Sequence, residues 1–136
     1  LKDIAKLQKL RSLRLDNTNK VTDAGLKEVA KLKQLTKLIL ADTQITDAGL
    51  KDIAELKQLE WLGLSHTKIT DAGLKDVAKM QNLVGLCLDD TKITDAGLKE
   101  LANLKNLADL FCNETQITAT GIAELQKALP KCKVFD

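Results

Sequence analysis

A six-residue segment recurs along the chain at a fixed interval and constrains the fold more than any other feature. The segment ITDAGL occupies Ile45–Leu50, Ile69–Leu74 and Ile93–Leu98, and each copy begins 24 residues after the one before. A variant, VTDAGL, lies at Val21–Leu26, and a diverged copy, ITATGI, lies at Ile117–Ile122. Repetition at this length indicates a solenoid, in which each unit packs only against its neighbours. The 136 residues accommodate about five such units.

Residues 59–82 show what one unit should form. Leu62 and Leu64 alternate with variable residues, which is the period of a strand with one buried face. From Leu74 onward the apolar residues recur at helical spacing, with charged residues between them. Each unit therefore combines a short strand with a helix, and stacked units would place a parallel sheet on one face and helices on the other.

The segment between strand and helix carries capping and charge signals. Thr70 is a favourable N-cap, and Asp71 places a negative charge at the positive end of the helix. Asp71 and Lys75 are spaced as an i,i+4 ion pair, which we interpret as a minor stabiliser of the helix. The same pair recurs at Asp23/Lys27, Asp47/Lys51 and Asp95/Lys99.

The strand and the turn after it resemble the leucine-rich repeat family. The pattern Leu-x-x-Leu-x-Leu-x-x-Thr covers nearly the whole chain and begins near Leu10, Leu35, Leu59, Leu83 and Leu107. Its first interval is 25 residues, because Asn19 is an extra residue. Thr18 and its equivalents replace the usual Asn or Cys of the family, and we expect their hydroxyls to bond to the turn backbone. The ITDAGL segment is similar to helix-containing repeats of bacterial proteins and to the cysteine-containing repeats of F-box substrate receptors.

The resemblance implies an α/β fold: a right-handed leucine-rich repeat solenoid with a parallel concave sheet, convex helices and about five repeats. It also implies a non-enzymatic module that binds a protein through the concave face or, as an alternative, the substrate-receptor part of a ubiquitin ligase. We expect a single domain over residues 1–136, with a partial N-terminal helix over 1–8 and a C-terminal cap over 125–136 that ends in an edge strand. Because the first residues copy the middle of a unit, we expect more repeats or another domain upstream.

The outward-facing strand positions differ from unit to unit, whereas the positions that flank them are nearly constant. Alternation along each strand places these variable positions on the concave face. This contrast is the strongest functional signal in the sequence, because repeated positions build the scaffold. The predicted protein-binding surface comprises Arg14, Lys37, Ile39, Trp61, Gly63, Ser65, Gly85, Cys87, Asp89, Asp109, Phe111 and Asn113.

The composition of this surface favours an interface. Its apolar centre would consist of Ile39, Trp61, Cys87 and Phe111. Aromatic and arginine anchors surrounded by polar groups are typical of an interface centre. Gly63 and Gly85 beside the only tryptophan leave either a depression or room for the indole to lie flat. The alternative is a surface without function, whose residues vary because nothing constrains them, since isolated exposed apolar residues need no explanation.

The sequence offers little catalytic or metal chemistry. His66, the only histidine, should lie between Asp42 and Asp90 at the strand exits, where the three could hold a cation or simply form a solvated acidic row. We favour the solvated row and predict no metal and no cofactor. Ser65 and His66 are sequence neighbours whose side chains diverge, so we predict no catalytic triad, and no glycine-rich phosphate loop occurs.

The cysteines and the net charge bear on the cellular compartment of the protein and on the class of its partner. Cys87 should face outward and Cys112 inward, so the two cannot pair, while a link between Cys112 and Cys132 stays open. Unpaired thiols would favour a reducing, cytoplasmic compartment. A net charge of +2 gives no case for nucleic acid, and no apolar run approaches the roughly 20 residues of a membrane span. We therefore predict a protein partner, no nucleic acid, no membrane insertion and a monomer.

Overall fold

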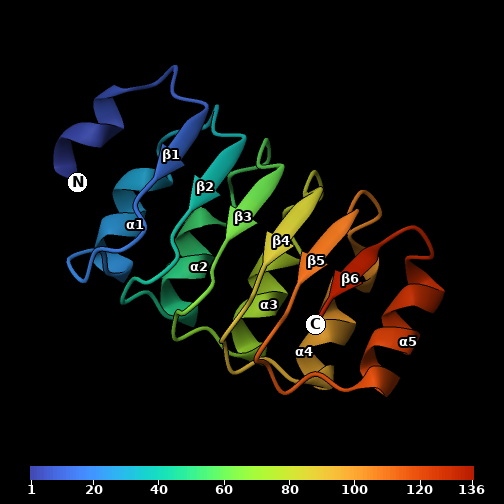
Figure 1. The fold of residues 1–136 in the computed structure, drawn as a ribbon. Coiled ribbons are helices and arrows are strands. Elements are labelled where there is room, and N and C mark those ends of the chain that lie inside the picture. The colour runs from blue at the N-terminus through green and yellow to red at the C-terminus, as the bar shows by residue number, and fades with distance from the viewer.

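The computed structural model describes all 136 residues as one solenoid of strands and helices (Figure 1). The strands are β1 (Ser12–Arg14), β2 (Lys37–Ile39), β3 (Trp61–Gly63), β4 (Gly85–Cys87), β5 (Asp109–Phe111) and β6 (Lys133–Phe135). The α-helices are α1 (Asp23–Val29), α2 (Asp47–Ile53), α3 (Asp71–Val77), α4 (Asp95–Glu100) and α5 (Ala119–Ala128). Two 3₁₀ helices, η1 (Lys2–Lys6) and η2 (Leu101–Asn103), complete the chain. No helix has both the length and the apolar character needed to cross a membrane.

The six strands form one parallel sheet in sequence order, and the helices lie together on its other side (Figure 1). The core between these two layers is a single cluster of 30 buried residues. Leu62 and Leu64 are fully buried, whereas Trp61 on the same strand is only half-buried. The predicted alternation, with one face of each strand in the core and the other outside, is confirmed.

The threonine after each of the strands β2 to β5 closes the turn that follows. The Thr43 hydroxyl donates to the carbonyl oxygen of Leu40 at 2.7 Å. Thr67, Thr91 and Thr115 make the equivalent bond at 2.6, 2.6 and 2.7 Å. The predicted bonds from threonine to the turn backbone therefore form at four of the five positions, each within its own unit. The hydroxyl of Thr18, in the turn that holds the extra residue Asn19, makes no such bond. The four bonds satisfy hydroxyls that are buried or half-buried, which would otherwise be costly to desolvate.

The aspartate of ITDAGL joins adjacent repeats, and our prediction of an i,i+4 ion pair is wrong. Asp71 accepts hydrogen bonds from the backbone N–H of Thr94 at 2.8 Å and from its hydroxyl at 2.6 Å. No ion pair forms between Asp71 and Lys75. The carboxylate instead faces two donors at the start of the next helix. The same two bonds join Asp23 to Thr46, Asp47 to Thr70 and Asp95 to Thr118.

The glycine of ITDAGL leaves room for this contact. A Cβ on Gly97 would collide with the carboxylate of Asp71, and one on Gly73 would collide with that of Asp47. No glycine of the chain has a positive φ, so backbone freedom is not the reason for its presence. Together, the aspartate of one unit and the threonine and glycine of the next form what we call the inter-repeat joint.

The two ends of the solenoid differ from its middle. The N-terminal segment, expected to be helical over residues 1–8, forms the shorter 3₁₀ helix η1, in which no residue is buried. Only α1 packs against it, so it buries too little apolar surface to hold longer α-helical turns. Leu1 takes the place against Gly25 that an aspartate takes in later units. At the other end, β6 pairs in parallel with β5 as an edge strand, and Ala119 stands where other units have the joint's aspartate.

Candidate functional site

Strand pairing brings the predicted surface residues into two rows across the exposed face of the sheet. The first row follows the register through Ser12, Lys37, Trp61, Gly85 and Asp109. The second row runs through Arg14, Ile39, Gly63, Cys87 and Phe111. Both rows continue onto β6, where Lys133 lies beside Asp109 and Phe135 lies beside Phe111. Residues from six consecutive strands therefore share one surface.

The indole of Trp61 lies over Gly85 on the neighbouring strand. A Cβ on Gly85 would collide with indole atoms Cε3 and Cζ3, so only glycine admits this position of the ring. Ile39 covers Gly63 in a similar way, because its Cδ1 would be 3.0 Å from a Cβ there. Trp61 lines none of the pockets of the molecule. Of the two arrangements expected around these glycines, room for the indole is the one found.

Three aromatic rings form a continuous strip across β3, β5 and β6. The centroids of Trp61 and Phe111 are 6.2 Å apart with the rings tilted by 50°, and those of Phe111 and Phe135 are 4.6 Å apart in a stacked pair. The ammonium of Lys37 lies 5.8 Å from the centre of the Trp61 ring, at cation–π distance. We call Trp61, Phe111 and Phe135 the aromatic row. Phe135 is 42% exposed, although aromatic rings usually bury large areas.

The charged residues on either side of the aromatic row are partly neutralised within the chain. Arg14 donates to both carboxylate oxygens of Asp16 at 3.2 and 3.1 Å, and this bond lowers the pKa of Asp16. Asp89 accepts from the backbone N–H of Asn113 at 2.8 Å and from its side-chain amide at 2.9 Å. Ser65 and Asp109 are half-buried.

The strand exits carry a row of non-glycine residues in the left-handed region. His66 has a φ of 55°, and its Nδ1 lies 2.8 Å from Asp90 Oδ2. This hydrogen bond is the main cause of a raised pKa of His66; burial lowers the pKa in part, and the charges of Asp42, Asp90 and Asp89 raise it. No group of three or more His, Cys, Asp or Glu side chains is arranged to hold a metal ion. The other members of the row are Asn17, Asp42, Asp90 and Glu114, with φ of 58°, 56°, 49° and 56°.

A comparison with known families accounts for this architecture. A family model described as the leucine-rich repeat region matches residues 1–132. The chain belongs to the leucine-rich repeat family. No curated protein matches it.

Three solved leucine-rich repeat structures illustrate the likeness. An internalin (InlF) from Listeria monocytogenes has a TM-score of 0.84 and 27% identity, over 100% of this chain and 37% of that one. Internalin C2 of the same species has a TM-score of 0.76 and 29% identity, over 98% of this chain and 55% of that one. A leucine-rich repeat protein from Leptospira interrogans has a TM-score of 0.62 and 26% identity, over 98% of this chain and 39% of that one. The chain thus spans between about a third and about half of these relatives.

Leucine-rich repeat domains are in general non-enzymatic modules for protein interaction. In this domain, none of the cysteines has the lowered pKa that activates a thiol as a nucleophile. All three are free, so Cys112 and Cys132 are not linked. Burial raises the pKa of Cys112 to about 11 and also raises that of Cys87. Thiols with raised pKa values are poor nucleophiles near neutral pH.

Sequence reasoning missed two members of this leucine-rich repeat surface. Phe135 completes the aromatic row, and Lys133 stands beside Asp109. The signal was present, because the terminal segment was expected to be an edge strand and the register of β5 extends directly onto it. The positive φ at His66 and its equivalents was also missed, although Asn, Asp and His are enriched in that region.

Proposed function

We propose that this leucine-rich repeat domain binds a protein partner through the exposed face of its sheet, with the aromatic row as the anchor. The aromatic row itself is the observation that carries the proposal. Its rings are packed against one another on the outer face of the sheet, whereas the core lies on the inner face. A cluster of aromatic side chains on one exposed face is more typical of an interaction surface than of an idle one.

The surface is also held in place before any partner arrives. Trp61 rests on Gly85 and lies under Lys37, while Phe111 is enclosed between two other rings. Anchors that are already fixed lose less conformational entropy on binding. Six strands about 4.8 Å apart give a face roughly 24 Å wide, which is enough for part of a standard interface.

The charge of the domain favours a protein over a nucleic acid as the partner. A net charge of +2 is small, and the exposed face carries Asp89 and Asp109 as well as Lys37 and Arg14. Phosphate backbones are bound by surfaces with many uncompensated cations. No feature of the fold favours the ubiquitin-ligase role over general protein binding. His66 pairs with Asp90, which supports a structural role for that histidine.

Affinity capture with three matched baits tests the proposal. The intact domain, a Trp61→Ala variant and a Lys51→Ala variant are immobilised and exposed to an extract of the source organism, and retained proteins are quantified by mass spectrometry. We expect at least one protein retained by the intact domain and by Lys51→Ala, and depleted at least tenfold by Trp61→Ala. Lys51 lies exposed on helix α2, away from the sheet face. Retention that depends on Lys51 but not on Trp61 would place the working surface on the helices.

A further inference from the structure

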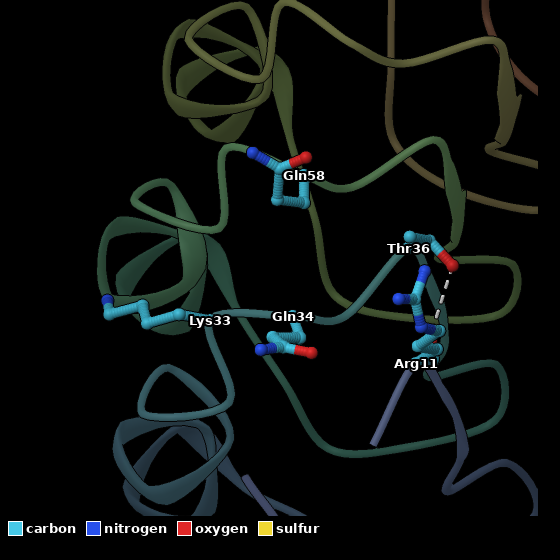
Figure 2. A pocket seen from close by; sticks show the side chains of 5 residues that line it. All are labelled: Arg11, Lys33, Gln34, Thr36 and Gln58. Atoms are coloured by element: carbon cyan, nitrogen blue, oxygen red, sulfur yellow. Dashed lines mark hydrogen bonds between the residues drawn. The ribbon is translucent and has the colours of Figure 1, made fainter. Parts of the chain in front are cut away.

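A pocket of about 420 Å³ lies at the edge of the sheet where helices α1 and α2 lead into strands β2 and β3 (Figure 2). It is distinct from the aromatic row, none of whose residues lines it. No acidic residue lines it either. Figure 2 shows Arg11 and Lys33 at opposite ends of the pocket, with Gln34 between them. The full lining is Arg11, Lys33, Gln34, Thr36 and Gln58.

At one end of the pocket, a bond that recurs in other units is missing. The residue two positions before the first leucine of each strand segment usually donates to a carbonyl at the end of its own helix. Lys57, Gln81 and Lys105 bond in this way to the residue three positions back, at 3.3, 2.7 and 3.0 Å, and Gln8 does the same. Lys33 holds the equivalent position but makes no such bond and no ion pair. Its ammonium is therefore free.

A second recurring bond is missing between the same units. Asn82 donates to the carbonyl oxygen of Lys57 at 2.8 Å, and Asn106 donates to that of Gln81 at 3.3 Å, so each asparagine fastens its turn to the preceding repeat. Gln34 and Gln58 occupy the equivalent positions, and their longer side chains make no such bond. Both amides are left exposed at the pocket, with their donors unused.

The remaining end of the pocket supplies an uncompensated guanidinium. Arg11 is exposed and takes part in no ion pair. Its backbone is held in place, because its carbonyl oxygen accepts from the Thr36 hydroxyl at 3.1 Å and from the Thr36 N–H at 2.8 Å (dashed line to the hydroxyl in Figure 2). Glu60, the acid beside Thr36 on the next strand, is not part of the lining. The pocket therefore combines two free cations with two free amides.

We propose that this pocket binds a ligand that carries two oxyanion groups, such as phosphates or sulfates, one at Arg11 and one at Lys33. A guanidinium binds such a group through two parallel N–H donors, and an ammonium binds it as a point charge. The amides of Gln34 and Gln58 donate to the part of the ligand between the two groups. Because Arg11 and Lys33 lie at opposite ends of the pocket, each would bind a separate group of the ligand (Figure 2).

Titration with defined anions, followed by nuclear magnetic resonance of backbone and side-chain amides, tests the proposal. The probes are inositol hexakisphosphate and sucrose octasulfate, with inorganic phosphate as the single-group comparison, all in physiological salt. We expect saturable shifts at Gln34, Thr36 and Gln58 with at least one of the two larger probes, and at least tenfold weaker binding of phosphate. Shifts with both larger probes would indicate recognition of oxyanions in general, and shifts with one would name the group. Absence of saturable shifts with both would overturn the proposal.

Two variants distinguish specific binding in the pocket from unspecific attraction of anions to an exposed lysine. Lys33→Gln and Lys105→Gln make the same change at the same repeat position, but only the first touches the pocket. We expect at least tenfold weaker binding for Lys33→Gln and less than a twofold change for Lys105→Gln. Equal losses would overturn the proposal, because they would show attraction to net charge alone.

A third variant removes one free amide from the pocket without changing the charge of the pocket. Gln58→Asn restores the residue found at positions 82 and 106, so its amide should bond to the carbonyl oxygen of Lys33. We expect binding of the probe to weaken at least threefold while the fold is retained, and unchanged affinity would argue against the assigned amides. Trp61→Ala should bind the probe as the intact domain does, so this test and that of the aromatic row stand apart.

Discussion

At the scale of single residues, the usual link between glycine and positive φ angles is absent: no glycine of this chain has a positive φ, and the residues that do are not glycines. All seven glycines have ordinary backbone angles, and five other residues, among them Asp42 and His66, have positive φ. Four of the five helical glycines are present because the aspartate of the preceding unit lies where a Cβ would be, as at Gly73. Close approach between repeats, rather than backbone freedom, therefore explains these positions.

This distinction predicts opposite results for one substitution at two sites. Gly73→Ala should lower the free energy of unfolding by about 1–2 kcal/mol, because the added methyl collides with Asp47 and outweighs the better helix propensity of alanine. Gly25→Ala should be neutral or stabilising by up to about 1 kcal/mol, since only the tip of Leu1 has to move. Urea unfolding followed by circular dichroism measures both. Equal destabilisation at the two sites would show that the joint is not what requires glycine.

The His66–Asp90 pair predicts a pH dependence at a single residue. The folded-state pKa of His66 is raised mainly by the hydrogen bond to Asp90, so it should exceed the usual value of about 6.5. The stabilising effect of the charged pair is fully present below about pH 6.5 and is lost as the pH rises through the raised pKa. Histidine ring resonances followed by nuclear magnetic resonance should show this pKa, and Asp90→Asn should lower it. A pKa that Asp90→Asn leaves unchanged would remove the hydrogen bond as the cause.

At the scale of the element, the inter-repeat joint fastens each helix to the next. Asp71 takes two hydrogen bonds from Thr94, one of them from the backbone N–H at the N-cap of α4. The threonine hydroxyl also accepts from the N–H of Ala96, so one side chain caps its own helix and holds the preceding one. Stacking of the units therefore has a polar component beside the continuous apolar core.

Substitution of the joint should be more costly than substitution of the exposed lysine beside it. Asp71→Ala should lower the free energy of unfolding by about 1–3 kcal/mol, because it leaves two donors of Thr94 without their partner. Lys75→Ala should cost well under about 1 kcal/mol, since Lys75 is exposed and forms no ion pair. Urea midpoints of the two variants decide this. A larger effect of Lys75→Ala would restore the i,i+4 pair as the stabilising interaction.

The strands, their buried faces and their pairing could be predicted from the sequence, whereas the side-chain hydrogen bonds that join one unit to the next could not. Period-two leucines such as Leu62 and Leu64 give the strand, its buried face and, through the repeat, the sheet register. Asp71 was misread because its partner Thr94 lies 23 residues away, whereas Lys75 is close in sequence. The pocket at Lys33 was missed because it results from bonds that other units make and this pair of units does not.

At the scale of the whole molecule, stability should fall toward the N-terminal end. Helix η1 buries no residue, and Leu1 and Leu7 are 44% and 54% exposed. In later units an aspartate of the preceding unit bonds to the threonine at this position, but no aspartate bonds to Thr22. Leu1 covers Gly25 in the place of that aspartate. Units in a solenoid are stabilised by their neighbours, so the N-terminal unit has one weak neighbour and one strong one.

Amide hydrogen exchange should reveal this gradient. Local opening needs less free energy where fewer contacts hold a segment, so amides of residues 26–32 should exchange faster than the equivalent amides of residues 74–80. Both segments cover the same part of the repeat, which makes them matched controls for intrinsic exchange. Equal protection in the two segments would show that η1 supports the first unit as firmly as a full repeat does.

The central claim is that repeated positions build the scaffold while the exposed face of the sheet binds a partner. Surface plasmon resonance with the captured partner tests it most directly. Trp61→Ala should weaken binding by at least about 2 kcal/mol, roughly 30-fold, with little loss of stability, while Lys51→Ala and Lys99→Ala should change affinity less than about twofold. Loss of binding in the lysine variants, with Trp61→Ala unaffected, would contradict the account.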